Sequence, residues 1–171
     1  MRTRLLSIDD AAEHAAALAA ERDFLAPYEP MRSDAFYTAA GQREVLRLRL
    51  ERYEAGVEVP RAILDDDGAI VGGITLQTIE RGPFLSCGVG YWVARAANGR
   101  GFASAAVAEV LDLAFGDLGL HRVQAVTLLD NARSQRVLGK NGFERIGTAP
   151  KYLKLAGEWK DHHLFQRLAP V

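Results

Sequence analysis

Residues 91–103 read Tyr91-Trp92-Val93-Ala94-Arg95-Ala96-Ala97-Asn98-Gly99-Arg100-Gly101-Phe102-Ala103, and this stretch is the most informative part of the sequence. A strand pattern ends at Val93, a short loop follows, and two glycines precede a helical pattern. Backbone N–H groups at the start of a helix lack intrahelical partners, and the macrodipole adds partial positive charge there. Because glycine lets a bulky anion approach these donors, the stretch predicts a pyrophosphate-binding loop. An ordinary tight turn before a helix is the alternative.

Two common phosphate motifs do not fit this loop. A Walker A loop requires Gly-Lys followed by Ser or Thr, and that run is missing here. The dinucleotide fingerprint requires G-x-G-x-x-G, which the Asn98–Gly101 spacing lacks. The interpretation of the loop therefore depends on the segments around it.

The chain after the loop predicts alternating helices and strands. Apolar residues first recur at helical spacing and then at the spacing of strands. The predicted elements are a helix over 103–115 closed by Gly116 and Gly119, a strand over 121–129, a helix over 131–140 capped by Asn141-Gly142, and strands over 143–155 and 159–168 joined at Ala156-Gly157.

The chain before the loop predicts helices followed by a hairpin. The predicted elements are a strand over 2–7, a helix from about 9 to 22, a break at 27–30, a helix from about 42 to 56, strands over 61–64 and 69–71, and a strand over 84–93. The acidic run 65–67 lies between two strand patterns and ends in Asp-Gly, so we interpret it as a turn rather than a metal site. The order predicts an α/β (α+β) layer with helices on both faces of a mixed sheet.

Composition places the chain among ordinary globular proteins. Its 171 residues suit one domain, taken here as 1–171, and 49% of them are hydrophobic. The net charge of −1 gives no support to nucleic acid as a partner. Cys87 is the only cysteine, and no run is apolar enough for a signal peptide or a membrane span. We therefore expect a cytoplasmic protein that binds neither nucleic acid nor membrane.

Several motifs together resemble the GNAT acetyltransferase superfamily. The superfamily's loop pattern Q/R-x-x-G-x-G/A falls on Asn98–Ala103, where Gly101 and Ala103 match and Asn98 departs from Gln or Arg. Asn131-x-x-Ser134 and Gly142-Phe143-Glu144 resemble ribosomal-protein N-acetyltransferases of the RimJ/RimL type. The segments 23–32 and 152–162 resemble the alanine-acetylating RimJ members, with their "FLxPWEPxR" and "YLxxxGxWxDH" patterns.

The resemblance implies a fold, a reaction and a cofactor. It implies a mixed, mostly antiparallel sheet of about seven strands flanked by about four helices. It also implies transfer of an acetyl group from acetyl-CoA (coenzyme A) to an amine, with the N-terminal alanine of a ribosomal or other protein as the favoured acceptor. Dimers occur in the family, so a homodimer is one assembly to consider. The alternatives are a small-molecule acceptor (antibiotic, polyamine or amino acid) and a non-catalytic acetyl-CoA-binding module.

The same resemblance assigns roles to individual residues. The cofactor-binding set is Tyr91, Trp92, Val93, Asn98, Gly99, Arg100, Gly101, Phe102, Ala103, Ser104, Asn131 and Ser134. Ser134 is expected near the sulfur as proton donor to the departing thiolate. The alternative for Asn131 is a structural role as a helix N-cap. The substrate-binding set is Tyr28, Glu29, Arg32, Asp161 and His162.

The choice of base follows from the pKa of the acceptor. A free α-amino group has a pKa of about 7.7–8.0, against about 10.4 for lysine, so an α-amine needs only a modest base. Glu29 is our candidate, with Asp161 and His162 as second choices, and an exposed loop carboxylate is the alternative for Glu29. His162 and His163 point to opposite faces of a strand, so no metal is expected. Cys87 is expected as a buried strand residue rather than an acetyl carrier.

Overall fold

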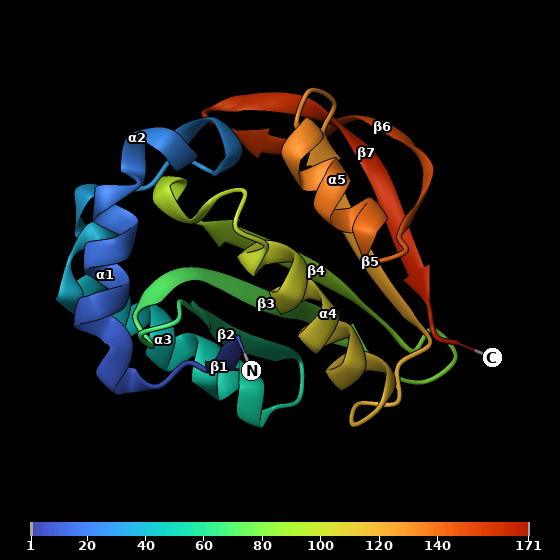
Figure 1. Cartoon of the computed structure of the whole chain (residues 1–171), viewed down its shortest axis with the longest axis horizontal. Helices are drawn as coiled ribbons and strands as arrows, with labels where there is room; N and C mark the ends of the chain where they lie inside the picture. Colours follow the sequence, from blue (N-terminus) through green and yellow to red (C-terminus); the bar gives the residue numbers. More distant parts are fainter. Residues whose placement is uncertain (1, 171) are drawn as a thin grey trace.

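A computed structural model describes residues 2–170, which form a seven-stranded sheet with helices on both faces (Figure 1). The strand order is β1-β2-β3-β4-β5-β7-β6. The strands are β1 (Thr3–Leu5), β2 (Glu58–Leu64), β3 (Ile70–Glu80), β4 (Ser86–Val93), β5 (Arg122–Leu128), β6 (Glu144–Leu155) and β7 (Glu158–Leu168). The β4–β5 pair is parallel and the other neighbouring pairs are antiparallel.

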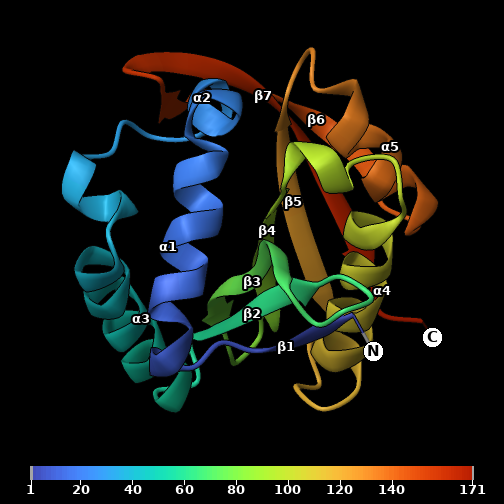
Figure 2. The ribbon, with the colours of Figure 1, turned by 60° about the vertical axis from the view of Figure 1, so that its left-hand side comes forward.

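The helices form two layers around this sheet. The α-helices are α1 (Ala11–Ala20), α2 (Arg22–Leu25), α3 (Ala39–Glu54), α4 (Phe102–Phe115) and α5 (Ala132–Lys140). Short 3-10 turns span Ile8–Asp10, Ala26–Tyr28, Asp34–Tyr37 and Arg95–Ala97. Figure 2 shows α1 and α3 on one side of the sheet and α4 and α5 on the other. Within residues 2–170, none of the helices combines the length and apolarity that crossing a bilayer would require.

Each layer closes its own hydrophobic core. On the α4 side, Val107 and Val110 are fully buried with Val123 of β5. On the other side, Leu46 of α3 packs with Ala62 of β2. Buried faces on both sides hold the middle of the sheet in place and thereby fix the strand ends that form the site.

The sheet opens between its two central strands. β4 and β5 pair only over three positions, from Ser86 opposite Arg122 to Gly88 opposite Gln124. Beyond Gly88, β4 continues to Val93 on its β3 partner, and β5 continues on β7. The two parallel strands therefore diverge and leave a gap in the sheet that side chains and a ligand can enter.

Most predicted elements are confirmed, and their bounds differ where tertiary contacts decide. The predicted helix over 9–22 is wrong at its end: α1 stops at Ala20, Glu21 leaves helical geometry, and α2 begins at Arg22. This adds a fifth α-helix to the four expected. α3 begins at Ala39, because the Thr38 hydroxyl accepts a 3.0 Å hydrogen bond from the Gly41 N–H and caps the helix.

The strand predicted over 69–71 continues to Glu80. Gly72-Gly73 interrupts its apolar pattern, but these glycines have a packing reason, since a Cβ at Gly72 would lie 2.4 Å from the Trp92 carbonyl oxygen. The predicted turn at 65–68 is confirmed, because the Asp65 carboxylate accepts hydrogen bonds from the Asp67 and Ala69 N–H groups. The predicted mixed sheet with helices on both faces is likewise confirmed.

Candidate active site

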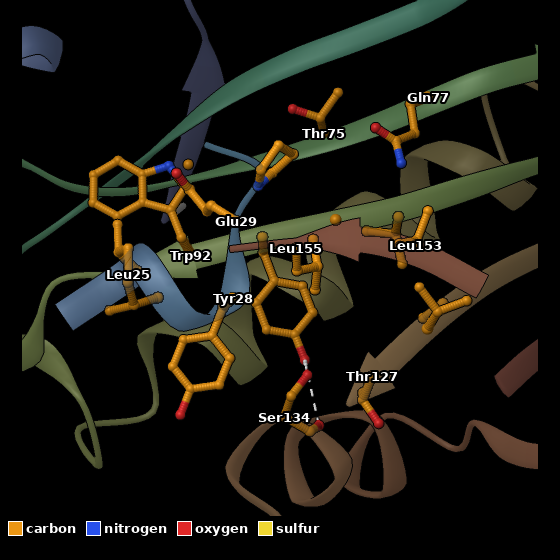
Figure 3. Close-up of a pocket in the computed structure, with 18 of the residues that line it drawn as sticks. Leu25, Tyr28, Glu29, Thr75, Gln77, Trp92, Thr127, Ser134, Leu153 and Leu155 are labelled. Carbon is orange, nitrogen blue, oxygen red and sulfur yellow. Dashed lines mark hydrogen bonds between the residues drawn. The ribbon is translucent and has the colours of Figure 1, made fainter. Parts of the chain in front are cut away.

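A cavity of about 840 Å³ occupies the gap between β4 and β5. Its walls come from α1, α3, the loop after α2, the hairpin of β6 and β7, and the start of α5. Figure 3 shows part of this lining, including Trp92, Glu29 and Ser134. Among the predicted site residues it brings together Tyr28, Glu29, Arg32, Tyr91, Trp92, Val93, Asn98, Ala103, Asn131, Ser134 and His162.

Tyr91 and Trp92 divide the cavity into two sides. They are consecutive in β4, so their side chains point to opposite faces of the sheet. The Tyr91 hydroxyl reaches Ser134 of α5, whereas the Trp92 ring lies edge-on to His14 of α1, with ring centroids 6.0 Å apart. The gap therefore joins a side lined by α5 to a side lined by α1 and α3.

The α5 side contains a pair of hydroxyl groups. The Tyr91 hydroxyl lies 2.8 Å from Ser134 Oγ and 3.3 Å from the Ser134 carbonyl oxygen (dashed lines at Ser134 in Figure 3). Burial raises the pKa of Tyr91 to about 12, so this phenol keeps its proton at neutral pH. Asn131 Oδ1 accepts a 3.1 Å hydrogen bond from the Ser134 N–H, so the N-cap role is present. The cap holds Ser134 at the first turn of α5, facing the gap.

The opposite side contains a half-buried carboxylate. Glu29 lies in the loop after α2, and Figure 3 shows it among the residues that line the cavity. Burial raises the pKa of the Glu29 carboxyl above its ordinary value, and the nearby Arg32 guanidinium partly offsets the rise. The Ala156 N–H donates a 2.9 Å hydrogen bond to the Glu29 carbonyl oxygen. The tip of the β6–β7 hairpin thus holds the loop that carries this carboxylate.

Polar groups from α1 and α3 complete the Glu29 side. His14 Nδ1 lies 2.9 Å from Gln42 Oε1, and burial lowers the pKa of His14, which favours the neutral imidazole. Arg49 donates hydrogen bonds to Glu58 at 2.6 Å and to the Thr75 hydroxyl at 2.6 Å. No sequence motif indicates this network, because its members are far apart in the chain.

The glycine loop before α4 lines a second cavity, of about 430 Å³. Gly99 and Gly101 have φ angles of 77° and 85°, which residues other than glycine rarely adopt. Within residues 2–170, the N–H groups of residues 99–103 have no hydrogen-bond partner. The loop therefore presents several backbone donors at the start of a 14-residue helix, as an anion site requires.

A group of basic side chains that was not among the predicted site residues surrounds this second cavity. The group comprises Arg95, Arg133, Arg136 and Lys140. The last three lie on α5 at spacings of three and four residues, which places them on one helix face. That spacing is a sequence signal that could have identified them. These cations and the free amides fit a ligand with several phosphates.

The remaining predicted residues lie in different places. The Arg100 guanidinium lies outside both cavities, 3.8 Å from Asp66 and over the Phe102 ring. Ser104 lines the second cavity and accepts a 3.2 Å hydrogen bond from the Asn141 amide. The Asp161 carboxylate lies outside the cavity and accepts a 2.8 Å hydrogen bond from the Lys151 N–H.

The two histidines and the cysteine follow the expected strand geometry. His162 is buried and lines the larger cavity, while the neighbouring His163 lies 2.9 Å from the Thr148 hydroxyl. Cys87 is buried in β4, and burial raises the pKa of its thiol to about 12. A thiol that keeps its proton at neutral pH is a poor nucleophile, so we assign Cys87 to the core.

Comparison with known proteins gives a consistent result. The family model "Acetyltransferase (GNAT) domain" matches residues 1–144. The probable N-acetyltransferase YjcK of Bacillus subtilis is 36% identical over 98% of this chain and 93% of its own length. The [ribosomal protein uS5]-alanine N-acetyltransferase of Escherichia coli is 30% identical over 98% of this chain and 87% of its own length.

A solved structure agrees with these sequence relatives. RimJ of Mycobacterium smegmatis, in complex with CoA-disulfide, superposes with a TM-score of 0.93 at 31% identity. The match covers 98% of this chain and 81% of that one. The likeness therefore includes the sheet, both helix layers and the hairpin that borders the cavity.

Proposed function

Since this chain belongs to the GNAT family of acetyl-CoA-dependent N-acetyltransferases, we propose that its acceptor is the N-terminal α-amino group of a protein, with alanine as the favoured first residue. The observation that carries the proposal is the division of one cavity by Tyr91 and Trp92. A proton-holding hydroxyl pair lies on one side, and a carboxylate of raised pKa lies on the other. This arrangement suits direct transfer between two substrates that enter from opposite sides.

The glycine loop and the basic face of α5 would hold the cofactor. Acetyl-CoA supplies a thioester whose carbonyl carbon an amine can attack. The N–H groups of residues 99–103 suit the pyrophosphate of the cofactor, and Arg136 and Lys140 suit a further phosphate group of the same cofactor. Ser134 and Tyr91 keep a proton beside the gap, where a departing thiolate would need one.

Glu29 suits the removal of a proton from the acceptor amine. A carboxyl of raised pKa is a stronger base than an exposed glutamate, and an α-amine of pKa about 7.7–8.0 needs only modest help at neutral pH. A lysine side chain, with a pKa of about 10.4, would need a stronger base. This difference favours an α-amine over a lysine side chain as the acceptor.

Relatives along almost the whole chain support a protein acceptor. The E. coli relative acts on alanine of ribosomal protein uS5, and a ribosomal acceptor here would place the reaction in the cytoplasm. The second candidate is a small-molecule amine, because an L-amino acid N-acetyltransferase of E. coli is 33% identical over 60% of this chain. The same cofactor site would serve either acceptor.

A panel of acceptors tests the proposal. The purified protein is incubated with acetyl-CoA and with short peptides that begin with Ala, Ser or Met, and in parallel with polyamines, amino acids and aminoglycosides. We expect acetylation of the peptides, fastest for Ala, measured by mass spectrometry. Acetylation of the small amines alone would overturn the proposed acceptor.

Cofactor binding is tested separately by thermal unfolding. We expect acetyl-CoA to raise the Tm of the protein by ligand linkage. Gly101→Glu should abolish this rise, because it places a carboxylate against the pyrophosphate. Gly82→Glu is the matched control, since Gly82 also has a positive φ (72°) and open space around it but lies outside both cavities. Equal shifts in the two variants would exclude the loop as the binding site.

A further inference from the structure

β3 and β4 contain four glycines, Gly72, Gly73, Gly88 and Gly90, and packing within the fold requires glycine at only two of these positions. A Cβ at Gly72 would lie 2.4 Å from the Trp92 carbonyl oxygen, and a Cβ at Gly73 would lie 2.8 Å from Trp92 Nε1. These two positions leave no space for a side chain. Close packing against Trp92 therefore explains why both positions are glycine.

Gly88 and Gly90 have no such reason. A Cβ at Gly90 would meet only the Gln77 amide, at 3.9 Å, and a Cβ at Gly88 would meet Gln77 Cγ at an ordinary 3.5 Å. Neither residue has a positive φ. Glycine in the interior of a strand weakens the strand, and it often marks a place where a ligand or another backbone comes close. The structure of the chain alone therefore does not account for glycine at these two positions.

Both glycines lie on the acceptor face of the sheet. Residues of β4 alternate between faces, so Cys87, Val89 and Tyr91 face α4 and α5, while Gly88 and Gly90 share the face of Trp92. Gly90 lines the cavity, and both glycines are partly exposed. The result is a strip of β4 backbone without side chains, which leads away from Trp92.

The wall beside this strip offers free hydrogen-bonding groups. Gln77 of β3 is opposite Gly88 in the register, and its exposed side chain points toward the cavity in Figure 3. Within residues 2–170, the Gln77 amide has no hydrogen-bond partner, whereas the neighbouring Thr75 hydroxyl already accepts one from Arg49. An amide with a free donor and a free acceptor suits the N–H and C=O groups of a peptide.

We infer that the acceptor's polypeptide chain, behind its N-terminal residue, runs along β4 over Gly90 and Gly88 in an extended conformation, with its backbone hydrogen-bonded to the Gln77 amide. This inference deepens the proposed function and rests on it, since it assumes a peptide acceptor. The occupant follows from the shape of the strip, because a floor without Cβ atoms admits a main chain at close approach. It also follows from position, because the strip is continuous with the cavity that contains Glu29 and Ser134.

Substitution of Gly90 by valine tests the inference. Valine fits the strand and fills the strip, so the variant should be more stable than the wild type but worse at binding peptides. We expect a higher Tm, an unchanged Kd for CoA and a KM for a six-residue Ala-peptide raised about tenfold, which corresponds to about 1.4 kcal/mol. The rise should be smaller for a two-residue peptide, which does not reach the strip. Gly90→Ala should change the Tm and the peptide KM in the same directions but by smaller amounts.

The matched control is Gly147→Val. Gly147 lies in β6, has open space around it and a negative φ, and is outside both cavities. The control should keep the wild-type KM for every peptide. An unchanged peptide KM in Gly90→Val, or an equal rise for all peptide lengths, would overturn the inference while the proposed function stands. A wild-type protein that acetylates no peptide would overturn both.

Discussion

The hydroxyl of Tyr91 lies 2.8 Å from Ser134 Oγ, and this contact joins the central strand of the sheet to the first turn of α5. The contact depends on three local features. β4 diverges from β5 after Gly88, the Asn131 side chain caps α5, and burial raises the pKa of Tyr91 to about 12. Together they keep a proton at the point where the two sides of the cavity meet.

We predict that the two hydroxyls act as one proton-donating unit. Ser134→Ala and Tyr91→Phe should each lower kcat by about 100-fold, the lower end of the range for general acid catalysis. The double variant should be little worse than either single one, because each substitution already interrupts the same hydrogen bond. Steady-state kinetics measures kcat, and the CoA-induced rise in Tm should persist in all three variants. A double variant whose loss of kcat equals the product of the two single losses would contradict a shared role.

We predict that the basic face of α5 contributes more to cofactor affinity than Arg100 does. Arg136→Ala and Lys140→Ala should each raise the Kd for CoA by about tenfold, since a hydrogen bond to a charged group contributes about 1.5 kcal/mol or more. Arg100→Ala should have a smaller effect, because its side chain lies outside both cavities. Calorimetric titration at two salt concentrations measures these constants. The losses should shrink at high salt, where charges are screened.

The sequence predicts the order of elements because their signals are local. The Asp65–Gly68 turn, the cap at Asn131 and the glycines before α4 each need only a few adjacent residues. The bounds of α1 and β3 depend on contacts from distant segments. α1 ends before Glu21 although no glycine or proline is present there. β3 continues through Gly72, which is glycine because the Trp92 carbonyl oxygen occupies the space that a side chain would need.

The site was predictable to a similar extent. Ser134, Asn131 and the loop at 98–104 belong to contiguous motifs, and all lie at one of the two cavities except Arg100, whose side chain turns away. His14 meets Gln42 across 28 residues of sequence, and Ala156 holds Glu29 across a far longer separation. Such pairs follow from the packing of α1, α3 and the β6–β7 hairpin. No spacing in a single sequence indicates them.

We predict that Glu29 lowers stability while it supports activity. Burial raises its pKa, so the folded state binds the proton more tightly than the unfolded state does. Stability therefore falls as pH rises from the unfolded pKa, about 4.3, through the higher folded value. Glu29→Gln removes this loss and also removes the base.

The experiment compares Tm and rate across pH. At pH 7–8 the Glu29→Gln variant should have a higher Tm than the wild type. The difference should vanish well below the unfolded pKa of about 4.3, where the carboxyl is protonated in both the folded and the unfolded state. The kcat of the variant should fall by about 100-fold or more, as expected for loss of a general base. A lower Tm at pH 7 would mean that the carboxylate stabilises the fold instead.

We predict that Asp161 positions the hairpin wall of the cavity rather than touching the acceptor. Lys151 has a φ of 47°, which is strained for a residue with a side chain, and its N–H donates to the Asp161 carboxylate. The β6 register shifts between Ala149 and Leu153, and Leu153 lines the cavity. Asp161→Ala should therefore raise the KM for the acceptor and increase hydrogen exchange over residues 150–155. The Kd for CoA should be unchanged.

Two further variants separate this role from direct binding. Asp161→Asn keeps an acceptor oxygen for the Lys151 N–H and should retain most of the wild-type KM. Lys151→Gly removes the penalty of the positive φ, so the double variant Lys151→Gly/Asp161→Ala should recover part of the affinity that Asp161→Ala loses. A carboxylate that bound the acceptor directly would give the opposite pattern. Asn would then bind as poorly as Ala, and glycine at 151 would restore nothing, because the lost contact would lie on the substrate and not in the backbone of β6.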